Sequence, residues 1–380
     1  MYIVRDIEKR LRGLAADYPF VAVTGPRQSG KTTLVKAVFP DYAYVSLEEL
    51  DNRELARRDP RGFVASYPDR VIIDEVQRVP QLLSYLQTHA DTEGHEGMYI
   101  LTGSQNFSLI QAIDQSLAGR VGLLTLLPLS HREMQAAGVC PEALNEEIFR
   151  GAFPRIYGRG ISSSTYYANY LKTYVERDIR TLKNITDLSS FVRFLKICAG
   201  RIGQLLNMSS IANDCGISVP TVKAWLSALE ASYIITLLRP DCNNFSKRLV
   251  KMPKLYFCDT GLACSLLEIS SAKQLSTHYL RGGLFENLVI MDYVKNHFND
   301  GLTPQLSFWR DNNGNEVDLI ITHDGTQQAI EIKSGHTFSP DFFKGLRYWS
   351  RLSGSPKDNL TVIYAGTSDL TTSEGQLKRW

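Results

Sequence analysis

The feature that most constrains this chain is the segment GPRQSGKT at residues 25–32, which fits the pattern G-x-x-x-x-G-K-[ST] in full. It follows the apolar, β-rich run FVAVTG at residues 20–25 and precedes TLVKAVF, whose pattern predicts a helix. A strand, a glycine-rich turn and a helix in this order direct backbone N–H groups and a helix N-terminus toward one point. The sequence therefore predicts a phosphate-binding loop within an α/β domain.

This loop predicts ATP and Mg²⁺ as cofactors. Lys31 is expected to reach the β- and γ-phosphates, and the Thr32 hydroxyl is expected to ligate Mg²⁺. The expected nucleotide-binding residues are Gly25, Pro26, Arg27, Gln28, Ser29, Gly30, Lys31, Thr32 and Thr33.

The run RVIIDE at residues 70–75 supplies acidic partners for this loop. Asp74 ends an apolar strand and is expected to hold magnesium, and Glu75 is expected to polarise the attacking water. Ser104 ends the next strand, MYILTGS, and is a candidate γ-phosphate sensor, as is Gln105. Arg120 is a candidate for stabilising transition-state charge, in its own subunit or a neighbouring one; a surface arginine is the alternative.

The order of patterns predicts three domains in an α/β chain. Residues 1–130 alternate strand and helix patterns, residues near 150–240 have long amphipathic helical patterns, and strand signals return after about residue 250. We expect a parallel-sheet domain at 1–135, a helical domain at 136–260 and a smaller α/β domain at 261–380.

Composition narrows the functional classes. The net charge of +2 argues against a strongly basic surface that coats nucleic acid. Six scattered cysteines without a C-x-x-C pair predict buried or free thiols, not a disulfide framework or a zinc site. Without an apolar leader or an apolar stretch of about 18 residues, we expect a cytoplasmic protein with no membrane partner.

Residues 205–238 predict a helix, a turn, a second helix and a strand. Ser209 is expected to cap the first helix, Gly216 to turn the chain, and Ser218 to cap the second helix. The apolar face of the second helix is expected to contain Val222, Trp225, Leu226 and Leu229.

The following segment is basic and resembles the wing of a winged helix. Lys247, Arg248, Lys251 and Lys254 would suit a phosphate backbone, whereas the second helix offers only Lys223. A DNA-binding winged helix and a purely structural one therefore remain equally open.

Acidic residues and a lysine are also predicted to meet near the C-terminus. Glu331 and Lys333 lie two residues apart on one strand face, and a turn at residues 324–325 would bring them beside Asp318. With Glu286 from a helix, these residues suit metal-dependent phosphodiester cleavage with Mg²⁺ or Mn²⁺; Glu316 is a substitute ligand. An ion-pair ladder is the alternative.

Together these patterns resemble a prokaryotic group of AAA-type ATPases, of the AAA+ superfamily, that carry a C-terminal domain of unknown function. The resemblance runs through GPRQSGKTTL, VIIDEVQRVPQLL, YILTGSQNF, SLAGRVGLLTLLPLS, TYVERDIR, KLYFCDTGL, FENLV, FWRDNNGNEVDLI and IEIKSG. It implies an ATPase core, a helical linker with a winged helix and a restriction-endonuclease-like nuclease fold. It also implies a sensor role for Ser104, a nucleotide-facing Arg120, and a site made of Asp318, Glu331, Lys333 and Glu286.

Two functions follow as hypotheses. In the first, ATP turnover controls action on DNA, with cleavage by the C-terminal domain. In the second, ATP binding sets self-association or the binding of a protein partner, and the nuclease-like domain is an inactive docking module. A membrane transport ATPase has no support in the sequence.

Overall fold

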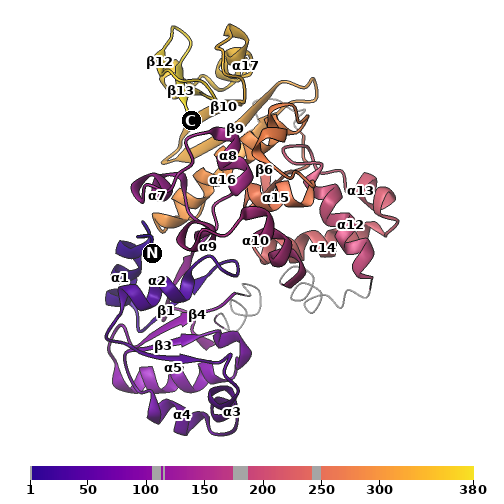
Figure 1. Ribbon diagram of the computed structural model, residues 1–380. Helices are drawn as coiled ribbons and strands as arrows, with labels where there is room; N and C mark the ends of the chain where they lie inside the picture. Colours follow the sequence, from indigo (N-terminus) through magenta and orange to yellow (C-terminus); the bar gives the residue numbers. More distant parts are fainter. Residues whose placement is uncertain (1, 105–112, 114–115, 174–186, 242–249) are drawn as a thin grey trace.

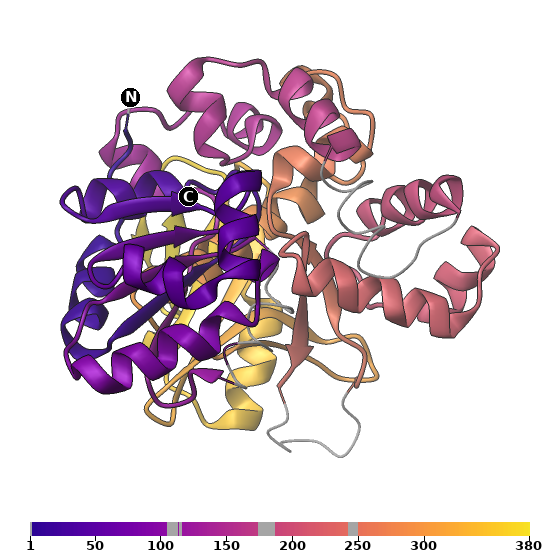
Figure 2. The same ribbon diagram turned by 90° about the horizontal axis from the view of Figure 1, so that it is seen from below.

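The computed structural model describes residues 2–104, 113, 116–173, 187–241 and 250–380. In Figure 1, an N-terminal α/β layer lies at one end and a second sheet at the other, with helices between them and to one side. Figures 1 and 2 both show α12 (Leu188–Ala199), α13 (Met208–Cys215) and α14 (Val219–Ala231) projecting beyond the first sheet. In the described part of the chain, no helix combines the length and the apolar character needed to cross a membrane.

The first sheet has five parallel strands in the order β2-β3-β4-β1-β5. Its strands are β1 (Phe20–Thr24), β2 (Ala43–Ser46), β3 (Val71–Asp74), β4 (Tyr99–Thr102) and β5 (Val121–Thr125). The central strands β1, β3 and β4 are buried throughout, as continuous apolar runs in a parallel sheet predict. The parallel sheet expected near the N-terminus is therefore confirmed.

Helices cover both faces of this sheet because successive strand residues point to opposite sides. Val21 and Val23 pack with α1 (Glu8–Asp17) and α2 (Lys31–Val38). Phe20 and Ala22 pack into the opposite core. That core is covered by α3 (Leu50–Arg58), α4 (Pro60–Ser66) and α5 (Leu82–Glu93), and η1 (Val76–Arg78) follows β3.

The middle of the chain is helical, as the sequence predicts. Besides α12–α14 it contains α7 (His131–Ala136), α8 (Leu144–Arg150), α9 (Pro154–Arg159) and α10 (Ser163–Tyr170). The expected motif TYVERDIR lies, apart from its first residue, outside the described residues.

The helix-turn-helix prediction is confirmed with one correction. Asn207, not Ser209, caps α13, because its side chain accepts from the Ser210 N–H at 3.0 Å. Gly216 ends α13 at φ 70, and Ser218 caps α14. The buried face of α14 contains Val222, Trp225, Leu226, Ala228 and Leu229.

The second sheet has eight strands in the order β12-β13-β11-β10-β9-β8-β6-β7. They are β6 (Ile235–Pro240), β7 (Lys254–Phe257), β8 (Leu306–Arg310), β9 (Glu316–His323), β10 (Thr326–Lys333), β11 (Leu360–Tyr364), β12 (Leu370–Thr371) and β13 (Gln376–Arg379). Its helices are α15 (Thr260–Leu266), η3 (Ala272–Ser276), α16 (Arg281–Asn299), η4 (Pro340–Phe343), α17 (Lys344–Ser353) and η5 (Lys357–Asn359).

The hairpin of β9 and β10 confirms the expected turn. His323 pairs with Thr326, so only Asp324 and Gly325 connect the strands, at φ 48 and 76. Both values lie in the left-handed region that a two-residue hairpin of this kind requires.

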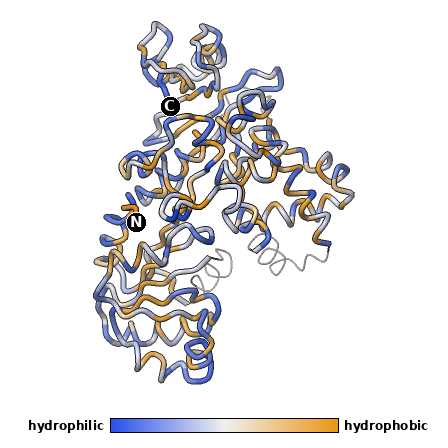
Figure 3. The backbone as a smooth tube through the Cα atoms, viewed as in Figure 1, coloured by the Kyte–Doolittle hydropathy of each residue, from blue (hydrophilic) through white to orange (hydrophobic). Residues whose placement is uncertain are grey.

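The middle helices share one hydrophobic core with the second sheet. This core joins Ile156, Phe194, Trp225, Leu288 and Ile330. Figure 3 shows hydrophobic stretches interspersed with hydrophilic ones along the helices and strands. β6 and β7 were expected within the helical domain, but β6 pairs with β8 and β7 pairs with β6, so both belong to the second sheet. The domain limits at 135 and 260 stay predictions.

Candidate functional site

The loop before α2 has a backbone that its glycines make possible. Gly25 has φ 143, and a Cβ there would lie 2.1 Å from the Leu126 carbonyl oxygen. Gly30 begins the helix at φ 98. Side chains at these positions would strain or displace the loop, so the glycine pattern is a direct requirement of its shape.

Lys31 lies inside this loop. Its Nζ donates to the carbonyl oxygens of Gly25 and Pro26, at 2.9 and 2.8 Å. Burial lowers the pKa of Lys31 to about 8, although the charges of Glu75 and Asp74 oppose this shift. Its ammonium is thus an interior cation held beside the loop backbone.

Asp74 lies at the carboxyl end of β3, and hydroxyl groups from three elements orient its carboxylate. Thr32 Oγ1 lies 3.2 and 3.1 Å from Oδ1 and Oδ2, and the Tyr44 hydroxyl donates to Oδ2 at 2.9 Å. Thr102 of β4 also contacts Oδ1. Thr32 and Asp74 therefore meet as expected. Tyr44 and Thr102 were not predicted at this site, because only the pairing of β2 and β4 with β3 brings their hydroxyl groups to Asp74.

Glu75 follows at φ 56, a left-handed conformation that residues other than glycine rarely adopt. Its Oε2 accepts from Ser104 Oγ at 3.1 Å and from Gln77 Nε2 at 2.5 Å. The structure thus brings Ser104 beside Glu75, and the sensor role of Ser104 stays a prediction. Gln105 lies outside the described residues.

Arg120 lies at the amino ends of the strands, on the opposite side of the sheet from the loop. It precedes β5, whose first residue pairs with Phe20 at the start of β1, whereas the loop follows the end of β1. Its guanidinium binds both oxygens of Asp91, at 2.6 and 3.1 Å. Arg120 therefore does not face the loop of its own chain, because it occupies the amino ends of the strands; a role in a neighbouring subunit stays a prediction.

A cavity of about 460 Å³ adjoins the loop. Arg5 forms part of its wall and donates to Ser29 O at 3.0 Å, Leu127 O at 2.8 Å and Glu133 Oε1 at 3.0 Å. The cavity is lined by Tyr2, Ile3, Arg5, Gln28, Gly30, Thr33, Pro154, Arg155, Gly158 and Arg159. No motif marks the residues of α9 and of the N-terminal segment, so the sequence does not predict their place at the cavity.

Tyr233 connects the middle helices to the first sheet. It precedes β6 at φ 56, and its hydroxyl lies 3.0 Å from Thr24 Oγ1 and 3.4 Å from Thr125 Oγ1. Because Thr24 immediately precedes Gly25, this contact touches the strand that carries the loop.

The C-terminal carboxylates surround a lysine that the sequence reasoning assigned elsewhere. Lys254 Nζ lies 2.9 Å from Glu286 Oε1 and 3.5 Å from Asp318 Oδ1, and it also contacts Glu316. Its side chain is 1% exposed. The expectation that Lys254 belongs to a basic wing is therefore wrong: a lysine in a buried strand needs acidic partners. Lys251 is exposed, and Lys247 and Arg248 lie outside the described residues.

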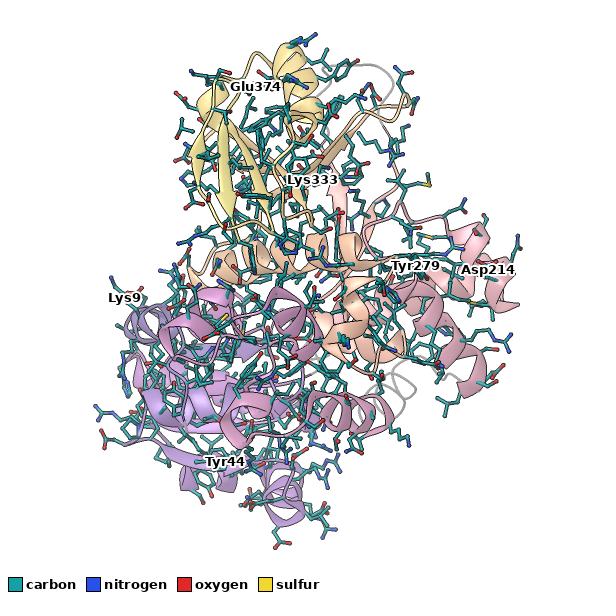
Figure 4. All side chains as sticks on the ribbon, turned by 45° about the horizontal axis from the view of Figure 1, so that its top comes forward. Lys9, Tyr44, Asp214, Tyr279, Lys333 and Glu374 are labelled. Atoms are coloured by element: carbon teal, nitrogen blue, oxygen red, sulfur yellow. The ribbon has the colours of Figure 1, made fainter. Side chains whose placement is uncertain are left out.

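Glu331, Lys333 and Asp318 complete this cluster. Lys333 Nζ lies 2.5 Å from Glu331 Oε1, and Asp318 Oδ2 accepts from the Ile332 N–H at 2.8 Å. Burial, and then the charge of Asp318, raise the pKa of Glu331 to about 8 and that of Glu286 to about 7. Figure 4 shows Lys333 on the second sheet, apart from Tyr44 at the first.

The residue types of this cluster suit a divalent cation, and one observation supports the fit. Glu331 Oε2 is buried and has no hydrogen-bond partner among the described residues. Lys254, however, already provides positive charge to Glu286, Glu316 and Asp318. The ammonium of Lys254 therefore compensates part of the negative charge of the cluster. Glu316 forms ion pairs with both Lys254 and Arg310.

Comparison with known proteins assigns families to separate parts of the chain. Residues 17–135 match a family model described as an AAA domain. Residues 141–273 match a domain of unknown function, DUF8612, and residues 281–379 match another, DUF4143. The nuclease-like character of the C-terminal part is thus not established by its family.

Two relatives are similar to most of the chain. They are uncharacterized proteins of Mycobacterium bovis and Mycobacterium tuberculosis, each 29% identical over 368 residues, covering 95% of this chain and 80% of the relative. Neither name states an activity.

Solved structures are only distantly similar. A Walker-type ATPase of Pyrococcus abyssi is 15% identical, with a TM-score of 0.41, and covers 69% of this chain and 94% of its own. AMPPCP-bound DnaA of Aquifex aeolicus is 12% identical, with a TM-score of 0.29, and covers 59% and 85%. At such TM-scores these likenesses support no functional inference. The loop geometry and the family match together support a P-loop domain of the AAA type at residues 17–135.

Proposed function

We propose that this chain binds ATP with Mg²⁺ at the loop of residues 25–32, hydrolyses it, and acts as a nucleotide-dependent switch. The observation that carries the proposal is the meeting of Thr32 and Asp74, with Glu75 beside them. These are the residue types that position magnesium and the attacking water in P-loop hydrolases.

Each residue has a defined task in this proposal. Lys31 and the loop N–H groups bind the phosphates, and Thr32 and Asp74 hold Mg²⁺. The bound Mg²⁺ would neutralise charge that develops on the phosphate oxygens. Glu75 orients and polarises water, and its contacts with Ser104 and Gln77 fix the carboxylate. The adjoining cavity would accept the remainder of the nucleotide between α9 and the N-terminal segment.

The switch follows from contacts between this domain and the rest of the chain. Arg155 and Arg159 of α9 line the cavity beside the loop, and the Tyr233 hydroxyl contacts Thr24 at the loop's base. Nucleotide bound there would contact the first domain and α9 together. We therefore infer that the nucleotide state changes the position of the helices and the second sheet, and with it the surface that can bind a partner protein or a second copy of the chain.

A Glu75→Gln variant tests the hydrolysis step. We expect ATP binding to persist and steady-state hydrolysis to fall by about 10²–10⁴-fold, the usual contribution of a positioned base. Lys31→Ala should lose ATP binding itself. The matched control is Glu96→Gln, which changes an exposed glutamate of the same domain. Undiminished hydrolysis by Glu75→Gln would contradict the proposed role.

The second candidate is metal-dependent cleavage of DNA by the C-terminal cluster. The unpartnered Glu331 Oε2 among Asp318, Glu286 and Lys333 favours it. Bound Mg²⁺ or Mn²⁺ would supply an activated water and stabilise the leaving oxygen. Lys333 would contribute positive charge, and Glu286, Asp318 and Glu331 would hold the metal in competition with the ammonium of Lys254.

This candidate is separable from the first. The protein would be incubated with single- and double-stranded DNA and RNA, with Mg²⁺ or Mn²⁺, with and without ATP. Cleavage that disappears in Asp318→Ala would support the nuclease, and cleavage that also depends on ATP and on Lys31 would couple it to the P-loop. If no substrate is cleaved while ATP hydrolysis is intact, the nuclease candidate is contradicted and the nucleotide-dependent switch remains.

A further inference from the structure

We propose that His131, Cys140 and Glu147 bind a divalent transition-metal ion of the zinc class, with one coordination position open to a cavity. One ligand atom from each residue lies within 4.8 Å of the other two. His131 Nδ1 lies 2.6 Å from Glu147 Oε1 and 3.7 Å from Cys140 Sγ. In the described part of the chain, this is the one such cluster of three or more histidine, cysteine and acidic ligands.

The three residues come from separate local structures that converge. His131 is the first residue of α7, whose start is fixed by the capping box of Ser130 and Glu133. Cys140 follows α7, and its N–H donates to Met134 O at 3.2 Å. Glu147 is in the first turn of α8. A spacing of nine and then seven residues matches no common zinc signature, which is why the cysteine pattern alone predicted no zinc site.

Contacts around the three residues hold their ligand atoms in place. The Trp380 Nε1–H donates to Glu147 Oε2 at 3.0 Å, which leaves Oε1 facing His131. The backbone N–H of His131 donates to Asp292 Oδ1 at 2.6 Å, and the Gln135 side-chain amide lies 2.7 Å from His131 Nε2. The atom of Gln135 at this distance is its amide nitrogen, which donates to Nε2, so the ring proton lies on Nδ1 toward Glu147 Oε1, where a metal ion would replace it. These outer contacts hold the ring of His131 in one orientation.

A cavity of about 730 Å³ borders the cluster. All three ligand residues line it, and so do Arg281 and His336 from the second sheet side. Glu147 is 3% exposed and His131 is 18% exposed, so the cluster is shielded yet reachable from the cavity. Three protein ligands with access to solvent is the arrangement of zinc sites that keep a position for water or another small ligand.

The chemistry of the ligands selects the class of ion. A thiolate, an imidazole and a carboxylate together suit a borderline-soft ion such as Zn²⁺, whereas Mg²⁺ and Ca²⁺ prefer oxygen ligands. Binding would release the proton that His131 shares with Glu147. The carboxylate cluster around Lys254 and the P-loop have no cysteine, so thiolate coordination distinguishes this site from both.

The experiment is a Co²⁺ titration of the full-length protein after removal of metals, without nucleotide. We expect one equivalent of Co²⁺ to produce sulfur-to-cobalt charge-transfer absorption, and Zn²⁺ to displace it. Cys140→Ser should abolish this absorption, and His131→Ala should weaken binding more than about 100-fold, beyond the usual effect of an outer contact. Gln135→Ala should weaken it by about 10-fold.

Cys215→Ala is the matched control, because Cys215 lies on α13 in the helix-turn-helix. It should retain the full absorption. The proposal is overturned if the unaltered protein shows no charge-transfer absorption, or if Cys140→Ser keeps it. Because the first result concerns the unaltered chain, the test stands even where a variant folds poorly.

Discussion

Replacing Lys254 with methionine keeps most of the side-chain length and removes the charge. The ammonium lies 2.9 Å from Glu286 Oε1 and 3.5 Å from Asp318 Oδ1, and the side chain is 1% exposed. Removing one partner of a buried ion pair leaves the other charge uncompensated, which costs about 3–5 kcal/mol. We therefore expect Lys254→Met to lower the free energy of unfolding of the part of the chain that contains the second sheet by about that amount at pH 7.

Urea unfolding followed by tryptophan fluorescence is a suitable assay. Trp309 and Trp349 are fully buried in the core of the second sheet and report on this region. Lys251→Met is the matched control, because Lys251 is exposed and its loss should change stability by less than about 0.5 kcal/mol.

Manganese provides a second measurement on the same variant. If Lys254 stands in for a cation, Mn²⁺ should stabilise Lys254→Met more than the unaltered protein, by about 2.7 kcal/mol at 100 times its Kd. The reasoning would be refuted if Lys254→Met lowered the free energy of unfolding by less than about 1 kcal/mol and by no more than the control does. Such a result would mean that water, not this ammonium, compensates the carboxylates.

Two further predictions concern Lys31 of the loop and Tyr233 at its base, and a third concerns Gly151 at the end of α8. Bound triphosphate favours charged Lys31, whose pKa in the free protein is about 8. Its ATP affinity should therefore be constant below pH 8 and fall up to about tenfold per unit above it, while Lys31→Arg stays constant, by calorimetric titration. Tyr233→Phe removes the hydroxyl contact with Thr24 and should cost about 0.5–1.5 kcal/mol in urea unfolding; an unchanged midpoint would contradict this. Gly151→Ala places a Cβ 2.1 Å from the Tyr167 hydroxyl at φ 65 and should cost at least about 1–3 kcal/mol, and unaltered thermal unfolding would exclude such strain.

The sequence alone was sufficient wherever neighbouring residues act together. The loop of residues 25–32 is contiguous, so its glycines and lysine indicate its shape without knowledge of the rest of the chain. The Asp324–Gly325 turn is equally local, because two residues of this type are enough to form a tight hairpin. The pairing of Glu331 with Lys333 is also local, because side chains two residues apart lie on the same face of a strand.

Only the tertiary structure determined which distant residues meet. Lys254 was assigned to a wing because basic residues surround it in sequence, yet strand pairing buries it against Glu286 and Asp318. Arg120 lies at the amino ends of the strands, whereas the loop of the same chain lies at their carboxyl ends. This separation follows from strand direction and not from residue type. The approach of His131 to Cys140 likewise depends on how the chain packs after α7. Local patterns repeat every two to four residues and therefore specify a turn or a face, whereas contacts between such faces depend on the path of the whole chain.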